Sequence, residues 1–185
     1  MSQIVAWTQW DDLKAPTGVT LHSPKDFPLE SSDLSQINFY VPSYMGGKGA
    51  LDWAAKMPNL KVLQMPNAGY DDALAYMRPG LILCNASGVH DASTAELAVT
   101  LALSSRRGIP GFVKDQIKEK WNHHRLTSLS DSKIGIVGFG SIGKQVAKNL
   151  SGFEVEVIGF SKSGRDGSKR IEELDDYLPC LDVVI

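Results

Sequence analysis

The fold is decided by the stretch KIGIVGFGSIGKQVAKNL at residues 133–150, followed by VEVIGF at residues 155–160. An apolar run comes first and a Gly-x-Gly-x-x-Gly turn second. Ile142, Val146 and Leu150 then recur at helical spacing before the second apolar run. This order predicts a strand, a turn, a helix and a strand, which is the setting of a dinucleotide-binding unit.

Each glycine of the turn has a physical task. Gly138 allows the tight turn out of the first strand, Gly140 lets a pyrophosphate approach the backbone, and Gly143 lets the helix pack against the sheet. The N–H groups of Ser141 and Ile142 stand at the predicted helix N-terminus, where the helix dipole attracts phosphate. The chain has 17 glycines, so the turn alone is weak evidence and a purely structural turn is the alternative. The flanking strands and helix favour dinucleotide binding.

The residues after the second apolar run predict which dinucleotide is bound. A carboxylate at this place holds the ribose 2′-hydroxyl of NAD. This chain has Ser161 there, with Lys162 and Arg165 close behind. A small hydroxyl and two cations suit a 2′-phosphate, which a carboxylate would repel. We therefore expect NADP or NAD as cofactor, with NADP preferred; a solvated basic loop is the alternative.

Composition bounds the class of protein. The 185 residues are 43% hydrophobic and 22% charged, with a net charge of −2, which is ordinary for a globular chain with one good core or two small domains. The charge gives no reason to expect nucleic acid or an anionic membrane as partner. No apolar run approaches the roughly 20 residues of a membrane span, and the first ten residues lack the pattern of a signal peptide. Cys84 and Cys180 are far apart, so we expect two buried thiols and a cytoplasmic location.

Short apolar runs alternate with helical patterns in the first half of the chain. The predicted strands cover residues 3–7, 37–41, 60–65 and 81–84, and the predicted short helices cover residues 50–57 and 71–77. Residues 11–33 are predicted to be loops with at most one short helix or strand. This rhythm predicts a parallel sheet with helices on its faces. Ligands bind beyond the carboxyl ends of such strands, where the loops at 43–47, 67–69 and 85–90 carry glycine and polar residues.

A helix is predicted from Thr94 to Ser105. Its pattern is apolar almost all round, which is typical of a buried helix. It could form the spine between two domains or part of a dimer interface. Arg106 and Arg107 follow at its negative end, and glycine and proline then break it. Residues 111–121 are predicted to form a more polar helix, and residues 123–132 are predicted to form a linker.

Other chemistries find little support in the residues. The four histidines, His22, His90, His123 and His124, stand at no metal-ligand spacing, so we expect no metal site. A Gly-x-Ser-x-Gly elbow, a P-loop and a Cys-x-x-Cys pair are missing from the sequence. These observations disfavour hydrolase, NTPase and zinc-dependent functions.

Several blocks, in the right order, resemble the D-isomer-specific 2-hydroxyacid dehydrogenases. Residues 60–71 (LKVLQMPNAGYD) look like the family's strand and substrate loop, and residues 84–97 look like the entry to its long helix. Trp121 stands where the family usually has a tryptophan. Residues 129–143 look like its cofactor turn, and residues 174–185 are similar to the stretch leading into its third nucleotide-domain strand. The resemblance covers the chain from about residue 37.

The resemblance implies an α/β fold with a flavodoxin-like N-terminal substrate domain and the first half of a Rossmann dinucleotide-binding domain. The expected division is residues 1–92 for the substrate domain, 93–132 for connecting helices and linker, and 133–185 for the partial NAD(P)-binding domain. In the family's strand order the strand at residues 133–137 would then be an unpaired edge, because only the first three strands are expected.

Site residues follow by position from the same resemblance. The implied substrate-binding residues are Tyr44, Met45, Gly46, Asn67, Ala68 and Gly69. The implied cofactor-binding residues are Thr94, Gly138, Gly140, Ser141, Ile142, Gly143, Ser161, Lys162 and Arg165. An exposed loop aromatic is an equal alternative for Tyr44, and helix N-capping is a competing role for Thr94.

The implied activity is hydride transfer between NAD(P)H and a small 2-oxo acid similar to glyoxylate or hydroxypyruvate. The family's catalytic Arg, Glu and His fall beyond Ile185, so we expect this chain to be an incomplete fragment without turnover. The expected partners are the 2-oxo or 2-hydroxy acid and a second copy of the chain bound through Thr94–Ser105, with no nucleic acid and no membrane. A non-catalytic dinucleotide-binding or subunit-interaction module is the alternative function.

Overall fold

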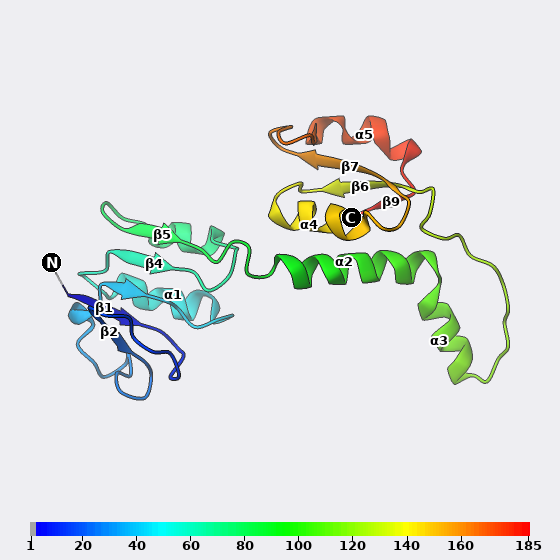
Figure 1. Ribbon diagram of the computed structural model, residues 1–185. Coiled ribbons are helices and arrows are strands. Elements are labelled where there is room, and N and C mark those ends of the chain that lie inside the picture. Colours follow the sequence, from blue (N-terminus) through cyan, green and yellow to red (C-terminus); the bar gives the residue numbers. More distant parts are fainter. Residues whose placement is uncertain (1–2) are drawn as a thin grey trace. The chain divides into compact units, whose positions relative to one another are not determined.

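A computed structural model describes residues 3–185, and the chain forms two compact units. The first unit extends to Val89 and the second runs from His90 to Ile185 (Figure 1). Each unit has its own hydrophobic core: one is built around Trp7, Tyr40 and Leu63, the other around Ile134, Ile136 and Val146. Each unit therefore contains apolar packing of its own.

The first unit is a parallel sheet whose strands are short. They are β1 (Ile4–Trp7), β2 (Val19–His22), β3 (Phe39–Tyr40), β4 (Val62–Gln64) and β5 (Ile82–Cys84). The strand order is β2-β1-β3-β4-β5, with every pair parallel. This is the flavodoxin-like order 2-1-3-4-5, so the predicted fold class of this unit is confirmed.

Helical segments connect these strands. They are the helix α1 (Gly47–Ala55) and the 3-10 turns η1 (Leu34–Gln36) and η2 (Asp71–Tyr76). The helix predicted at residues 50–57 begins earlier than expected, at Gly47. The φ of Gly47 is +57°, a value that glycine adopts without strain. The helix predicted at residues 71–77 is a 3-10 turn, stabilised by hydrogen bonds such as that from the N–H of Ala73 to the carbonyl of Tyr70.

Register explains the core of this unit. Trp7 lies opposite Tyr40, and Tyr40 lies opposite Leu63, so three buried side chains form a row across the sheet. The polar tips of the two aromatic residues are satisfied inside the unit. The Trp7 Nε1 donates to the carbonyl of Phe27 at 2.9 Å, and the Tyr40 hydroxyl donates to that of Ala50 at 2.8 Å. Burial raises the pKa of Tyr40, so it stays a neutral donor.

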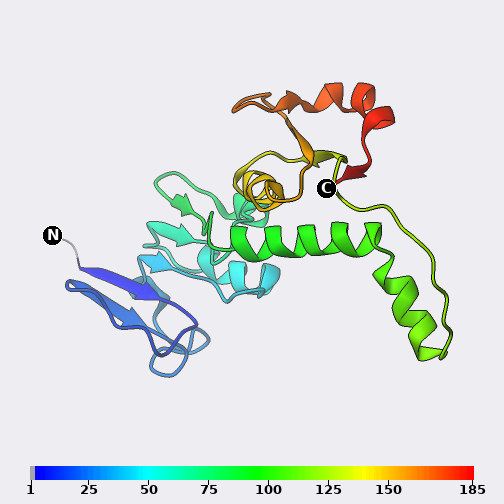
Figure 2. The same ribbon diagram turned by 45° about the vertical axis from the view of Figure 1, so that its right-hand side comes forward.

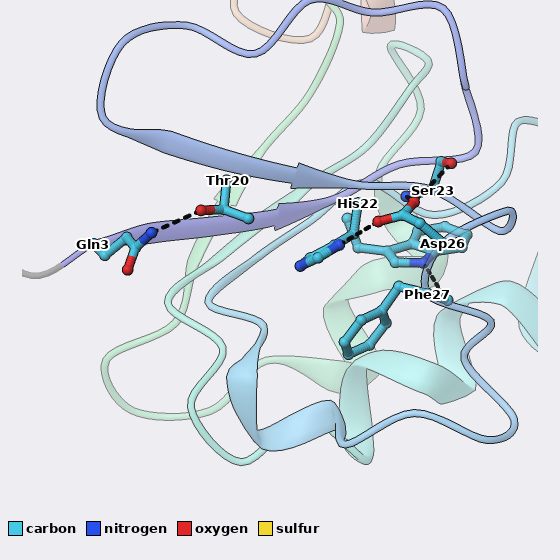
Figure 3. A network of polar contacts seen from close by, with 7 residues as sticks. Gln3, Thr20, His22, Ser23, Asp26 and Phe27 are labelled. Atoms are coloured by element: carbon cyan, nitrogen blue, oxygen red, sulfur yellow. Dashed lines mark hydrogen bonds and ion pairs between the residues drawn. The ribbon is translucent and has the colours of Figure 1, made fainter.

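Polar contacts hold β2 and the segment that follows it (Figure 3). Gln3 bonds Thr20 at 2.8 Å, and the imidazole Nδ1 of His22 pairs with Asp26. The other carboxylate oxygen of Asp26 accepts from the backbone N–H of Ser23 at 2.8 Å. His22 also packs against the ring of Phe27, with centroids 4.7 Å apart. The contacts of His22 with Asp26 and Phe27 therefore give this histidine a structural role in the first unit.

The second unit contains a four-stranded parallel sheet and the longer helices. The strands are β6 (Lys133–Val137), β7 (Glu156–Ser161), β8 (Lys169–Arg170) and β9 (Val183–Val184). The helices are α2 (Asp91–Arg106), α3 (Ile109–Ile117), α4 (Ser141–Leu150) and α5 (Leu174–Tyr177), with 3-10 turns η3 (Ile171–Glu173) and η4 (Leu178–Cys180). Figures 1 and 2 show α2 and α4 side by side.

The strand order of this sheet is β8-β7-β6-β9. It matches the start of the 3-2-1-4 order of a Rossmann domain, which confirms the predicted fold. One expectation is wrong. Within the apolar run at residues 181–185, Val183–Val184 forms a fourth strand, β9, beside β6, so β6 is paired on both sides. The third strand is Lys169–Arg170, which sequence periodicity misses because it has two exposed cationic residues and no apolar alternation.

The burial of α2 also differs from the expectation. Ala95, Val99 and Ala102 are buried, but Leu97 and Leu101 are 59% and 60% exposed. Ala95, Val99 and Ala102 thus face the core whereas Leu97 and Leu101 face outward, so the helix is not buried all round. After α2, the helix α3 and the segment that follows it extend from the rest of the second unit (Figures 1 and 2).

The cysteines are both free thiols. Cys84 is half-buried, whereas Cys180 is exposed, so the expectation of two buried thiols is wrong for Cys180. Among residues 3–185 the structure contains no helix that is long and apolar enough to cross a bilayer. The same residues form no cluster of three or more potential metal ligands from His, Cys, Asp and Glu.

Candidate functional site

The glycine turn joins β6 to α4 and leaves one side open. Gly138 has a φ of +95°, and its N–H donates to the carbonyl of Phe160 at 2.9 Å, which anchors the turn to β7. A Cβ on Gly143 would lie 2.4 Å from the carbonyl oxygen of Gly138, so the helix contacts the turn too closely for any side chain. A Cβ on Gly140 would meet no atom within 4 Å. Gly140 therefore borders open space at the helix N-terminus.

A hollow of about 750 Å³ lies over this turn. Its lining consists of Gly138, Phe139, Gly140, Ser141, Ile142, Lys144, Ser161, Lys162, Ser163, Arg165 and Asp166. It lies at the carboxyl ends of β6 and β7, where Rossmann sheets bind their ligand. A volume in the range of roughly 300–1,000 Å³ accommodates an organic ligand. The predicted residues of the turn and of the loop after β7 thus lie around one hollow, except that Gly143 is buried and outside the lining.

The open turn fits a dinucleotide pyrophosphate. The first N–H groups of α4 have no partner inside the helix and are the natural donors for phosphate oxygens. The missing Cβ at Gly140 lets those oxygens come close. When bound, the dinucleotide would supply the hydride-carrying nicotinamide. The chain's own contribution is the shape of the turn and the positive charge around it.

The loop after β7 is organised by its own hydroxyl groups. The Ser161 Oγ accepts from the N–H of Gly164 at 3.0 Å and contacts the Ser168 Oγ at 2.7 Å. The Ser168 hydroxyl in turn donates to the carbonyl of Arg165 at 2.6 Å. Ser161 therefore shapes the loop that carries Lys162 and Arg165, in addition to bordering the hollow.

Lys144 and Asp166 complete the charged lining of the hollow. The Lys144 Nζ lies 2.7 Å from the Asp166 Oδ2, which connects α4 to the loop. The hydrogen bond from Lys144 lowers the pKa of Asp166. Neither residue was singled out from the sequence. The sequence could have indicated Lys144, because it stands one helical turn after Gly140 and therefore lies on the same side of α4 as the glycine turn.

Thr94 lies in the first turn of α2. The helix begins at Asp91, and the N–H of Thr94 already donates to the carbonyl of His90 at 3.0 Å. The competing N-cap role for Thr94 is therefore wrong. The Ser141 Oγ lies 3.2 Å from the Asp91 Oδ1, so the N-terminal ends of α2 and α4 meet. Thr94 is exposed, one turn along α2 from that contact.

A second, smaller hollow of about 200 Å³ lies in the first unit. Its lining consists of Pro42, Ser43, Met45, Gly46, Gly47, Leu51, Met65, Pro66, Asn67 and Asp72. It brings together the ends of β3 and β4 and the start of α1. The small volume suits a ligand of only a few heavy atoms.

The predicted substrate residues divide between this lining and its surroundings. Met45, Gly46 and Asn67 line the hollow. Tyr44 is 45% exposed, and its N–H donates to the side-chain oxygen of Gln9 at 3.1 Å. Ala68 and Gly69 fall outside the lining, and the carbonyl of Ala68 accepts from the Asn85 side chain at 2.7 Å. Asn85 thus connects the loop after β5 to the loop after β4.

Asn67 has the feature expected of a ligand-binding side chain. Its Oδ1 is buried and has no hydrogen-bond partner within residues 3–185. A buried amide oxygen without a partner is costly, so a ligand or water that reaches it is favoured. Asp72, on η2, lies in the same lining and was not expected from the sequence, because its acidic pattern resembles that of a solvated first turn.

Comparison with known proteins agrees with this geometry. Residues 99–185 match the family model described as D-isomer specific 2-hydroxyacid dehydrogenase, NAD binding domain. The chain is 33% identical over 165 residues to a glyoxylate reductase of Thermococcus litoralis, which covers 83% of the chain and 47% of that protein. It is 31% identical over 119 residues to a D-3-phosphoglycerate dehydrogenase of Methanocaldococcus jannaschii, covering 62% of the chain and 23% of that protein.

Solved structures agree as well. The NADPH-dependent glyoxylate/hydroxypyruvate reductase of Sinorhizobium meliloti, crystallised with NADP and sulfate, matches with a TM-score of 0.77 and 25% identity. The match covers 99% of this chain and 61% of that one. The chain thus spans less than half the length of the two relatives named above and about three fifths of that structure. With its parallel sheets, glycine turn and matched sequence, the chain belongs to the family of D-isomer-specific 2-hydroxyacid dehydrogenases.

Proposed function

We propose that this chain supplies the substrate-binding unit and the dinucleotide turn of an NAD(P)-dependent oxidoreductase acting on a small 2-oxo acid. The observation that carries the proposal is the open glycine turn at the N-terminus of α4, bordered by the cationic loop after β7. The bound dinucleotide would exchange a hydride with the 2-oxo acid or its 2-hydroxy product. The described residues have roles in binding and orienting both molecules.

The cofactor proposal is tested by titrating the chain with NADPH and following the fluorescence of the nicotinamide. Gly140→Ala should abolish saturable binding, because a Cβ there projects into the space that the pyrophosphate needs. Gly152→Ala is the matched control, since a Cβ there also meets no atom within 4 Å and Gly152 lies outside the hollow. Equal binding by both variants would contradict the proposal.

We propose NADP as the preferred dinucleotide. Lys162 and Arg165 border the hollow and can pair with a 2′-phosphate, and Ser161 stands where a carboxylate would favour NAD. The similar reductase of Sinorhizobium meliloti is described as NADPH-dependent. Arg165→Gln should weaken NADPH binding more than NADH binding. A lower Kd for NADH than for NADPH in the unmodified chain would refute this preference.

The proposed substrate is a small 2-oxo acid similar to glyoxylate or hydroxypyruvate. The hollow of about 200 Å³ in the first unit and the unpartnered Oδ1 of Asn67 support it, as do the glyoxylate reductases among the relatives. Asn67→Asp should weaken hydroxypyruvate binding by roughly ten-fold, because a carboxylate would repel that of the substrate. Asn122→Asp, which makes the same change on an exposed residue outside this hollow, should leave binding unchanged. Calorimetric titration would measure both.

We also propose that the chain self-associates through α2 and α3. Leu97 and Leu101 on α2 are more than half exposed, and Ile117, at the end of α3, is 77% exposed. Leu97 and Leu101 lie one helical turn apart on α2, and large apolar side chains exposed next to one another mark interaction surfaces. The same observation favours the second candidate function, a subunit-interaction module. Light scattering should give a dimer mass, and the double variant Leu97→Glu, Leu101→Glu should give a monomer; a monomeric unmodified chain would refute the dimer.

A further inference from the structure

The hollow over the glycine turn has a carboxylate among its cations. Its charged lining residues are Lys144, Lys162, Arg165 and Asp166. The Asp166 carboxylate lies 2.7 Å from the Lys144 Nζ, so it neutralises the cation nearest the start of α4. The hydrogen bond from Lys144 lowers the pKa of Asp166, and the neighbouring Arg165 acts in the same direction. Asp166 is therefore ionised at neutral pH, and the lining has a net charge of +2.

The loop has internal hydrogen bonds that do not involve this ion pair. The Ser161 and Ser168 hydroxyls and the N–H of Gly164 form the internal hydrogen bonds of the loop. Ser168 is only 8% exposed and also donates to the Arg165 carbonyl. Lys144 and Asp166, by contrast, are 47% and 68% exposed. The carboxylate can therefore be removed without removing the bonds that hold the loop.

The backbone at Asp166 allows a clean substitution. Its φ is +56°, in the left-handed region that asparagine tolerates better than most residues. Asparagine has nearly the same shape as aspartate and carries no charge. Asp166→Asn therefore changes the charge of the lining from +2 to +3 and leaves the conformation in place.

We propose that Asp166 is a specificity-determining residue that limits how strongly the site favours a 2′-phosphate. The inference rests on the dinucleotide site proposed above. NADP and NAD differ by a 2′-phosphate, which carries a charge of about −1.5 to −2. The Asp166 carboxylate repels this group and occupies Lys144, which could otherwise pair with it. The 2′-hydroxyl of NAD is neutral, so the same carboxylate has little effect on it.

The test uses two small probes that differ only by the 2′-phosphate, adenosine 2′,5′-bisphosphate and 5′-AMP. Asp166→Asn should lower the Kd of the bisphosphate by about two- to five-fold, the range expected for one exposed charge pair. The Kd of 5′-AMP should change less. The selective gain should disappear in about 1 M salt, where the Debye length falls to about 3 Å.

A matched control is available in the other unit. Asp11 also pairs with a lysine, Lys25, at 2.9 Å. Asp11→Asn makes the same change in net charge and should leave both Kd values unaltered, which separates a local effect from one of overall charge.

Three outcomes would overturn the inference. Equal tightening of both probes, or none, would show that Asp166 does not discriminate between them. Weaker binding of 5′-AMP by Asp166→Asn would show that the carboxylate accepts a ribose hydroxyl. If the unmodified chain bound neither probe nor NADPH, the proposed dinucleotide site would itself fail, and this inference with it; binding of both probes without a selective change would overturn the inference alone.

Discussion

Gly140 and Gly143 belong to one turn, yet they exclude a side chain for different reasons. The Gly143 Cα faces the carbonyl of Gly138, so the fold itself leaves no space for a Cβ. Gly140 faces open space and has an extended backbone conformation that any residue can adopt. We therefore expect Gly143 to be needed for folding and Gly140 to be needed only for the approach of a ligand.

This difference predicts opposite phenotypes. Gly143→Ala should lower the free energy of unfolding by about 1–3 kcal/mol, because the backbone around Gly138 must move to avoid overlap. Gly140→Ala should change the free energy of unfolding by less than about 0.5 kcal/mol relative to the unmodified chain. Urea denaturation followed by circular dichroism measures both. Comparable destabilisation by the two variants would contradict this division of roles.

Ser168 is the buried residue that holds the loop after β7. Ser168→Ala removes the contact with the Ser161 Oγ and the bond to the Arg165 carbonyl. The expected cost is about 1 kcal/mol of unfolding free energy. Ser163→Ala, an exposed serine of the same loop, serves as control and should have little effect. Equal stabilities in urea would show that the hydroxyl network does not stabilise the loop.

At the scale of elements, Arg106 connects the end of α2 to segments distant in the sequence. Its Nη2 donates to the Ser132 Oγ at 3.1 Å and lies 3.9 Å from the Asp182 Oδ1. Asp182 in turn accepts from the backbone N–H of Lys133 at 2.9 Å. One side chain thus connects the ends of α2, β6 and β9. It lies at the C-terminal end of α2, where a cation is also favoured by the helix dipole.

Arg106→Leu should therefore destabilise the second unit by about 1–3 kcal/mol, since Ser132 is buried and loses its partner. Arg107→Leu is the matched control. Arg107 is exposed at the next position, and its substitution should cost less than about 0.5 kcal/mol. Urea denaturation measures the difference, and similar losses for the two variants would refute the role of Arg106 as a connector.

The stability that Asp26 gives to the segment after β2 should depend on pH in the acid range. Partial burial acts to raise the pKa of Asp26, but hydrogen bonds from His22 and Ser23 outweigh it and lower that pKa (Figure 3). A carboxyl whose pKa is lower in the folded state stabilises the fold above its ordinary pKa. This stabilisation is lost as the pH falls through the folded-state value, below about pH 4. Asp26→Asn should make stability less steep in pH over that range. An unchanged slope in urea denaturation between pH 3 and 6 would contradict this.

At the scale of the whole molecule, the two units have separate cores, and the glycine turn belongs to the second. A ligand stabilises the part of the protein that binds it by RT ln(1 + [L]/Kd), about 2.7 kcal/mol at a hundred-fold excess over Kd. In scanning calorimetry, NADPH should therefore raise the unfolding temperature of the second unit and leave that of the first unit unchanged. A single transition that shifts as a whole would contradict independent unfolding.

Local signals in the sequence were sufficient for most elements. Alternating and continuous apolar runs predicted β1, β3, β4, β5, β6 and β7, because a strand's burial pattern appears directly in its residues. The glycine spacing predicted the turn into α4, because the need for each glycine depends on the local backbone conformation or on nearby atoms. The roles of Thr94, Asn67 and the other predicted site residues in binding stay predictions.

Long-range pairing lay beyond those signals. Lys169–Arg170 forms a strand only because β7 offers it an edge, and Val183–Val184 forms β9 because β6 has a second edge free for it. The sequence of α2 could not predict which side of the helix packs against the core, because apolar residues stand on almost every side of it. In the structure, α4 contacts the side that carries Ala95 and Val99.

The sequence by itself determined the family, the parallel α/β architecture and the place of the dinucleotide turn, because these depend on short-range periodicity and on glycine geometry. The tertiary structure alone decided that Asp166 lies against Lys144, that Ser161 is bound within its own loop, and that Arg106 reaches Ser132. Those contacts join residues 7 to 26 positions apart. Such pairs form only when distant segments are brought together by the packing of the core, which no local pattern records.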